Sequence, residues 1–97
     1  MKVFISQPMT GKTKASIQAD RNTAIEEIRK MLGKDCEFIE SYNPKAVDPL
    51  KELGRCLTLM TEADVVYLVP GWSSSFGCSV ERACALHYNI RIINGER

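Results

Sequence analysis

Short apolar runs alternate along the chain with longer segments in which apolar residues recur at helical spacing. Residues 2–6 and 65–69 are rich in β-branched and aromatic side chains, which favour strands. The run 65–69 has no polar alternation, which is typical of a strand covered on both faces. Shorter runs at residues 36–41 and 90–93 predict two further strands.

Three amphipathic helices are predicted between these strands. The pattern of the first starts at Ser16 and stops at Gly33, with charged residues between the apolar ones. The third covers residues 77–88, after a loop at 72–76. The apolar positions of the first helix are Ile17, Ala24, Ile25, Ile28, Met31 and Leu32. The apolar stripe of the second helix consists of Leu50, Leu53, Leu57 and Met60.

Strands that alternate with helices predict a parallel sheet joined by right-handed crossovers, with helices on both faces. We therefore expect a three-layer α/β fold, flavodoxin-like or Rossmann-like, with about four strands in the order 2-1-3-4. A length of 97 residues leaves room for a single domain, residues 1–97. Ligands of such sheets bind at the carboxyl ends of the strands where the strand order reverses, which here brings loops 7–13 and 70–76 together.

The composition narrows the range of partners. Thirteen basic and 12 acidic residues give a formal charge of +1 without a basic run, so we expect neither a nucleic acid polymer nor a membrane as partner. Only a short apolar stretch follows Lys2, which predicts a cytoplasmic protein without a signal peptide or membrane span. The four cysteines lack Cys-x-x-Cys spacing and are interpreted as buried reduced thiols, so neither a metal site nor a cofactor is expected.

The stretch SQPMTGKT ends in the letters that close a phosphate-binding P-loop. Such a loop requires a glycine, four residues and then Gly-Lys-Ser/Thr, and Ser6 occupies the position of that first glycine. The chain also offers no acidic strand end to hold magnesium, so the triphosphate interpretation is rejected. Thr10 and Gly11 are left with two interpretations, a contact for an anion or sugar hydroxyl, or a plain Pro-x-x-Gly turn.

The stretch PGWSSSFGCSVERACA joins a buried strand to a helix and places Glu81 in the first turn of that helix. The helix dipole and free N–H groups stabilise a carboxylate there, so we expect Glu81 to be ionised at neutral pH, as suits a nucleophile. A first-turn glutamate is also common for the same electrostatic reason alone. Ser75 is a ligand contact or a helix cap, and Trp72 is a stacking ring, a lid or a buried loop anchor.

The pair ISQPMTG and PGWSSSFGCSVERACA resembles small, mostly phage and bacterial proteins related to nucleoside 2-deoxyribosyltransferases, and more distantly the 2′-deoxynucleoside 5′-monophosphate N-glycosidases. The resemblance covers nearly the whole chain in element order. It implies that Glu81 is the nucleophile, and that Ser75, six residues earlier, contacts a substrate phosphate, so that a nucleotide is favoured over a nucleoside. With the loop positions it gives the substrate-binding set Gln7, Met9, Thr10, Gly11, Gly71, Trp72, Ser75 and Gly77.

Two positions depart from the pattern of those enzymes. They carry an aspartate near the end of the second helix that assists proton transfer to the base, where this chain has Arg55, Cys56 and Leu57. They often have an aromatic residue after the first strand, where this chain has Gln7 and Pro8. Asp64, which begins its strand, and His87, at the far end of its helix, are both expected to lie away from the site.

Two functions follow from these observations. The first is an enzyme that acts on an N-glycosidic bond of a nucleotide or nucleoside through a glycosyl-enzyme on Glu81. The second is a nucleotide-binding or assembly module that keeps the pocket but lacks the acid. A small sheet with an edge to cover, and the oligomeric state of the enzymes it resembles, predict a homodimer or a larger homo-oligomer.

Overall fold

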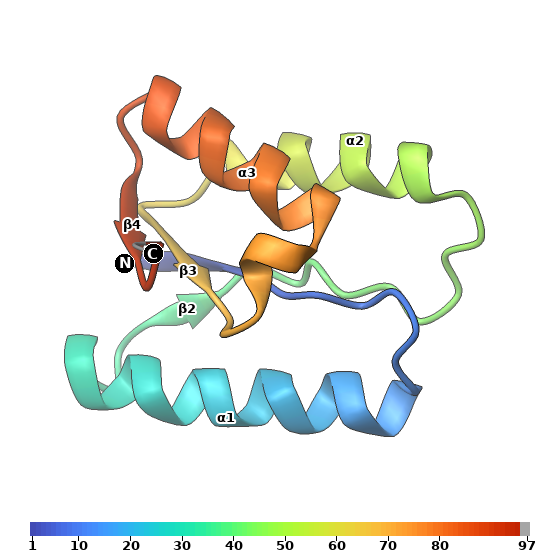
Figure 1. Ribbon diagram of the computed structural model, residues 1–97. Coiled ribbons are helices and arrows are strands. Elements are labelled where there is room, and N and C mark those ends of the chain that lie inside the picture. Colours follow the sequence, from blue (N-terminus) through green and yellow to red (C-terminus); the bar gives the residue numbers. More distant parts are fainter. Residues whose placement is uncertain (96–97) are drawn as a thin grey trace.

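Four parallel strands form the central sheet of the computed structural model, which describes residues 1–95 (Figure 1). They are β1 (Lys2–Ser6), β2 (Glu37–Phe38), β3 (Val65–Leu68) and β4 (Arg91–Ile93). Their order across the sheet is β2-β1-β3-β4, and each neighbouring pair is parallel. The α/β fold and the strand order predicted from the sequence are confirmed.

Helices cover both faces of this sheet, which makes the fold three-layered (Figure 1). α1 (Lys14–Leu32) lies on one face. α2 (Pro49–Met60) and α3 (Phe76–His87) lie on the other, and a short 3-10 turn, η1 (Trp72–Ser74), precedes α3. The chain therefore leaves the carboxyl ends of β1 and β3 toward opposite layers, the arrangement expected of a switch point.

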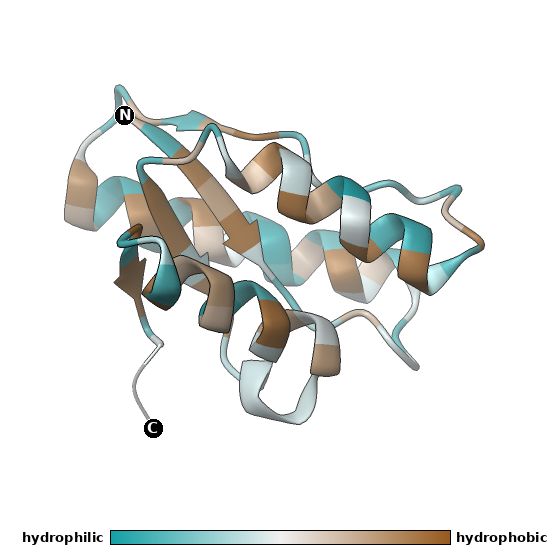
Figure 2. Cartoon of the chain, turned by 90° about the horizontal axis from the view of Figure 1, so that it is seen from above, coloured by the Kyte–Doolittle hydropathy of each residue, from teal (hydrophilic) through white to brown (hydrophobic). Residues whose placement is uncertain are grey.

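The side chains of the two central strands alternate between the two helical layers, and most of their residues are hydrophobic (Figure 2). The cluster on the α1 side includes Val3, Ile5, Ala24, Ile28, Tyr67 and Val69. The cluster on the α2–α3 side includes Phe4, Cys56, Met60, Val66, Leu68 and Ala85. Both faces of β3 are thus buried, which accounts for its run of apolar residues without alternation.

Local capping sets several boundaries that differ from the prediction. α1 begins two residues earlier than its apolar pattern, because the Thr13 hydroxyl accepts a hydrogen bond from Ser16 N at 3.1 Å. α3 begins at Phe76, because the Ser75 hydroxyl accepts one from Cys78 N at 3.3 Å. The predicted second strand is shortened to β2, although Ile39 N still donates to β1 at 2.9 Å.

The predicted apolar stripes are wrong at helix ends. Leu50, near the start of α2, is 78% exposed, and Met31, near the end of α1, is 49% exposed. The 19 residues of α1 span about 28 Å at about 1.5 Å each, whereas the five of β1 span about 17 Å at about 3.3 Å each. The helices therefore extend beyond the sheet that buries their middle turns. Within residues 1–95, no helix has both the length and the apolarity needed to cross a bilayer.

Candidate functional site

A cavity of about 280 Å³ lies at the carboxyl end of β1, between α2 and α3. Its floor includes Phe4 and Ile5 of β1, and its walls come from the loop after β1, the loop after β2 and the first two to three turns of α2 and α3. Glu81 of α3 and Glu52 of α2 both line it. Two carboxyl groups thus face an otherwise largely apolar hollow at the predicted switch point.

Glu81 is held inside this cavity by the last residue of β1. Glu81 is 7% exposed, and the Ser6 hydroxyl donates a hydrogen bond of 2.6 Å to Glu81 Oε1. Burial raises the pKa of Glu81 to about 7, against a smaller lowering by the Ser6 hydrogen bond. Near pH 7 the carboxyl group is therefore divided between its neutral and ionised forms.

The expected surroundings of Glu81 are wrong in two respects. α3 has no acidic residue in its first turn, because the helix begins at Phe76 and Glu81 falls in the second turn. There it is beyond the free N–H groups, and the helix dipole acts mainly within the first turn. Loss of hydration dominates instead, so the prediction of a fully ionised carboxylate at neutral pH is also wrong.

Four of the predicted substrate-binding residues line the cavity with Glu81, namely Gln7, Met9, Thr10 and Gly77. Gln7 is 6% exposed, and both the nitrogen and the oxygen of its side-chain amide are hydrogen-bonded. Its Nε2 donates to Ile17 O at 3.0 Å, and its Oε1 accepts from Arg21 Nη1 at 3.4 Å. Gln7 therefore shapes the cavity wall in a fixed orientation, while Met9 and Thr10 form part of its rim.

The other four predicted residues, Gly11, Gly71, Trp72 and Ser75, are not among those that line this cavity in the described chain. Trp72 is 6% exposed in the core of the α2–α3 side, with the Arg82 guanidinium 5.1 Å from its ring centre, so it is a buried loop anchor. Gly71 and Gly11 take φ values of +94° and +77°, which favour glycine. Ser75 caps α3, and its contact with a phosphate stays a prediction.

Asp64 and His87 lie away from the cavity, as expected. Asp64 Oδ2 accepts a 2.7 Å hydrogen bond from Lys2 N, at the amino end of the sheet. His87 ends α3 and packs edge to face against Tyr88. Neither side chain therefore takes the place of the aspartate that the enzymes it resembles carry near the end of the second helix.

Three residues that sequence reasoning did not single out also belong to the site. Ser6 ends β1, and its place at the carboxyl end of a central strand was a usable signal. Glu52 lies one helical turn before Cys56, which stands where the enzymes it resembles carry an aspartate. Helical spacing could therefore have placed Glu52 on the same face of α2. Phe76 lines the cavity yet is 79% exposed, and only the tertiary structure distinguishes its ring from that of Trp72.

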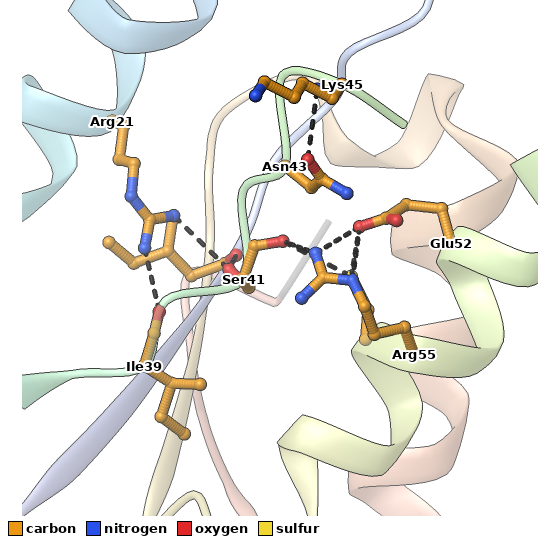
Figure 3. A network of polar contacts seen from close by, with 9 residues as sticks. Arg21, Ile39, Ser41, Asn43, Lys45, Glu52 and Arg55 are labelled. Atoms are coloured by element: carbon orange, nitrogen blue, oxygen red, sulfur yellow. Dashed lines mark hydrogen bonds and ion pairs between the residues drawn. The ribbon is translucent and has the colours of Figure 1, made fainter. Parts of the chain in front are cut away.

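Two guanidinium groups from opposite helical layers hold the loop after β2, which contributes Ser41 to the cavity (Figure 3). From α1, Arg21 donates to Ile39 O at 2.9 Å and to Ser41 Oγ at 3.4 Å. From α2, Arg55 donates to Ser41 O at 2.6 Å. Arg21 is 5% exposed, and its burial lowers the pKa of its guanidinium. The network fixes the part of the cavity wall that the loop after β2 forms.

Arg55 also pairs with Glu52, which turns that carboxylate into part of the same network (Figure 3). Arg55 Nε donates to Glu52 Oε1 at 2.9 Å, and Arg55 Nη2 contacts the same oxygen. Cys56 Sγ lies 3.7 Å from Ser41 O and 3.9 Å from Glu52 Oε1. Burial, followed by the charges of Glu81 and Glu52, raises the pKa of the Cys56 thiol to about 11, so it is not a thiolate nucleophile at neutral pH.

Within residues 1–95, no three His, Cys, Asp or Glu side chains gather in a way that could hold a metal ion. The fold and the cavity define a three-layer α/β protein with a buried carboxyl group at its switch point. The chain belongs to the family described as "Domain of unknown function (DUF4406)", whose model matches residues 1–94. Comparisons with curated proteins and with solved structures gave no match.

Proposed function

We propose that the protein cleaves the N-glycosidic bond of a nucleotide or nucleoside, with Glu81 as the nucleophile. The observation that carries the proposal is the buried Glu81 carboxyl group, held by Ser6 Oγ at 2.6 Å in a cavity at the carboxyl end of β1. Substrates of open α/β sheets bind at this place. The resemblance of the two site loops to nucleoside 2-deoxyribosyltransferases points to the same glutamate.

In the proposed reaction, ionised Glu81 attacks C1′ of the sugar. The bond from C1′ to the base nitrogen breaks, its electron pair leaves with the base, and a glycosyl-enzyme forms through an oxocarbenium-like transition state. Water or a second base then takes the sugar. The cavity favours this step because a poorly hydrated carboxylate interacts strongly with positive charge that develops on the sugar ring.

The exposed ring of Phe76 supports an aromatic substrate. Phe76 lines the cavity and is 79% exposed. Met9 and Leu53, which are partly exposed, add apolar surface to the same cavity. A nucleobase that stacks on such a ring gains about 1–3 kcal/mol. The preference for a 5′-phosphate rests on the resemblance at Ser75, beside the free N–H groups at the start of α3.

One observation favours the second candidate function, a nucleotide-binding module without chemistry. Near the end of α2, where the enzymes it resembles carry an aspartate, this chain has Cys56, and the pKa of its thiol is raised to about 11. Such a thiol is a weak proton donor for a departing base, and a positioned acid is worth about 100- to 10,000-fold in rate. Binding with no base release is the outcome that favours this candidate.

A homodimer or larger homo-oligomer is part of the proposal. Leu86 and Tyr88, at the end of α3, are 53% and 71% exposed. Tyr88 lines a second apolar hollow together with Leu57 and Met60. Covering this surface with a second copy removes apolar area from water. Light scattering coupled to gel filtration tests it, and a monomeric mass at micromolar concentration contradicts it.

The direct test is release of free base. The protein is incubated with 2′-deoxynucleoside 5′-monophosphates and the matching nucleosides, and free base is measured by chromatography. Glu81→Gln keeps the shape and the Ser6 acceptor but removes the charge, so we expect base release to fall by several orders of magnitude. Glu62→Gln, the same change at a 59% exposed glutamate outside the cavity, is the matched control. Undiminished release by Glu81→Gln contradicts the covalent mechanism.

A further inference from the structure

One face of α2 looks into the cavity and carries its second carboxylate. Pro49, Glu52, Leu53 and Cys56 all line the cavity, at the i, i+3, i+4, i+7 spacing that puts residues on one side of a helix. Glu52 enters from the opposite wall to Glu81, which α3 supplies. A ligand bound between α2 and α3 therefore has a carboxyl group on each side.

The Cys56 thiol lies close enough to Glu52 and Glu81 for the charges of both carboxyl groups to affect it. Its Sγ is 3.9 Å from Glu52 Oε1, and the charges of both Glu81 and Glu52 raise its pKa. No hydrogen bond joins Glu52 to Glu81 within the described chain, and the pKa of Glu81 is set by burial and Ser6. The two carboxyl groups thus line the same cavity without a hydrogen bond between them.

Arg55 leaves one oxygen of Glu52 available to a ligand. Its Nε and Nη2 both donate to Oε1, while within residues 1–95 no hydrogen bond to Oε2 occurs (Figure 3). Arg55 is itself fixed by its 2.6 Å bond to Ser41 O. The Glu52 side chain is 23% exposed, so it meets both the cavity and water. This is the placement of a group that exchanges protons between a bound water and solvent.

We propose that Glu52 is the general base that activates the water which resolves the glycosyl-enzyme. The inference rests on the proposed function. In this step the water oxygen bonds to C1′, the C1′–O bond to Glu81 breaks, and its electron pair returns to the Glu81 carboxylate. The proton of the water passes to Glu52 and then to solvent. The base released in the first step takes its own proton from solvent, so the net reaction is hydrolysis.

The test separates formation of the glycosyl-enzyme from its hydrolysis. Unmodified protein, Glu52→Gln, Glu52→Asp and Glu62→Gln are mixed with the common 2′-deoxynucleoside 5′-monophosphates, and base release is followed before and during steady state. We expect Glu52→Gln to release one burst of base and then turn over about 100- to 10,000-fold more slowly. Intact mass should rise by the mass of one deoxyribose phosphate less one water. Glu52→Asp keeps a carboxylate and should recover part of the turnover, and Glu62→Gln should behave as the unmodified protein.

Azide provides a readout that a structural role would not move. It is a nucleophile that needs no general base, so added azide should restore turnover of Glu52→Gln and give a glycosyl azide. If Glu52→Gln turns over as fast as the unmodified protein in steady state, the role of Glu52 is overturned while the proposed function stands. Equal slowing of burst and steady state, without adduct or azide rescue, also overturns it. Absence of base release by the unmodified protein overturns the proposed function, and this role with it.

Discussion

Replacing Glu81 with Gln should stabilise the protein at alkaline pH. Glu81 is 7% exposed, and burial raises the pKa of its carboxyl group from an ordinary 4.5 to about 7. The folded chain therefore binds this proton more tightly than the unfolded chain does. The resulting stabilisation is fully present below pH 4.5, is lost as the pH rises, and is gone once the pH has passed through about 7.

The size of this effect follows from the two pKa values. A difference of about 2.5 pKa units, at about 1.36 kcal/mol per unit, corresponds to about 3 kcal/mol of unfolding free energy lost between acid and alkaline pH. Gln has no proton to lose and still offers an oxygen to the Ser6 hydroxyl. Glu81→Gln should therefore resemble the protonated wild-type residue at every pH and avoid the loss.

Chemical denaturation of both proteins measures the effect without any substrate. We expect the two unfolding free energies to be similar near pH 4.5 and to differ by about 3 kcal/mol in favour of the variant at about pH 8. In thermal melts of a domain of this size, such a difference exceeds about 10 °C. Glu62→Gln, at an exposed ion pair with Lys2, should show no comparable change with pH. A difference between Glu81→Gln and wild type that is equal at both pH values would refute the reasoning.

Three further predictions concern the site. With the proposed nucleophile, kcat/KM for base release should rise as the pH passes through about 7, because only ionised Glu81 attacks; a fall over this range would make Glu81 a proton donor instead. Ser6→Ala removes the hydrogen bond that lowers the pKa of Glu81, so the rising limb of that profile should move to higher pH, and an unmoved limb contradicts this role. Phe76→Ala should weaken nucleotide binding by about 1–3 kcal/mol in calorimetry, whereas Leu50→Ala, at an exposed residue that does not line the cavity, should not; equal effects contradict stacking on Phe76.

The sequence by itself determined the fold and the edge of the sheet at which the cavity lies. Strand and helix periods are local properties, and the handedness of crossovers between parallel strands leaves few ways to arrange four strands with helices on both faces. The order β2-β1-β3-β4 and the meeting of the loops after β1 and β3 followed from these rules. Cap residues such as Thr13 and Ser75 shifted boundaries by a few residues without changing the order.

Only the tertiary structure decided which side chains face the cavity and in what electrostatic state. The Glu81 carboxyl group is desolvated by elements far from it in the chain, and its partner Ser6 is 75 residues away, so no local pattern gives its pKa. Trp72 begins η1 and Phe76 begins α3 only four residues later, yet one is 6% exposed and the other 79%. Burial depends on all neighbours in space, whereas a sequence pattern records only neighbours along the chain. The protonation state of Glu81 and the side chains that face the cavity could therefore not be predicted from the sequence.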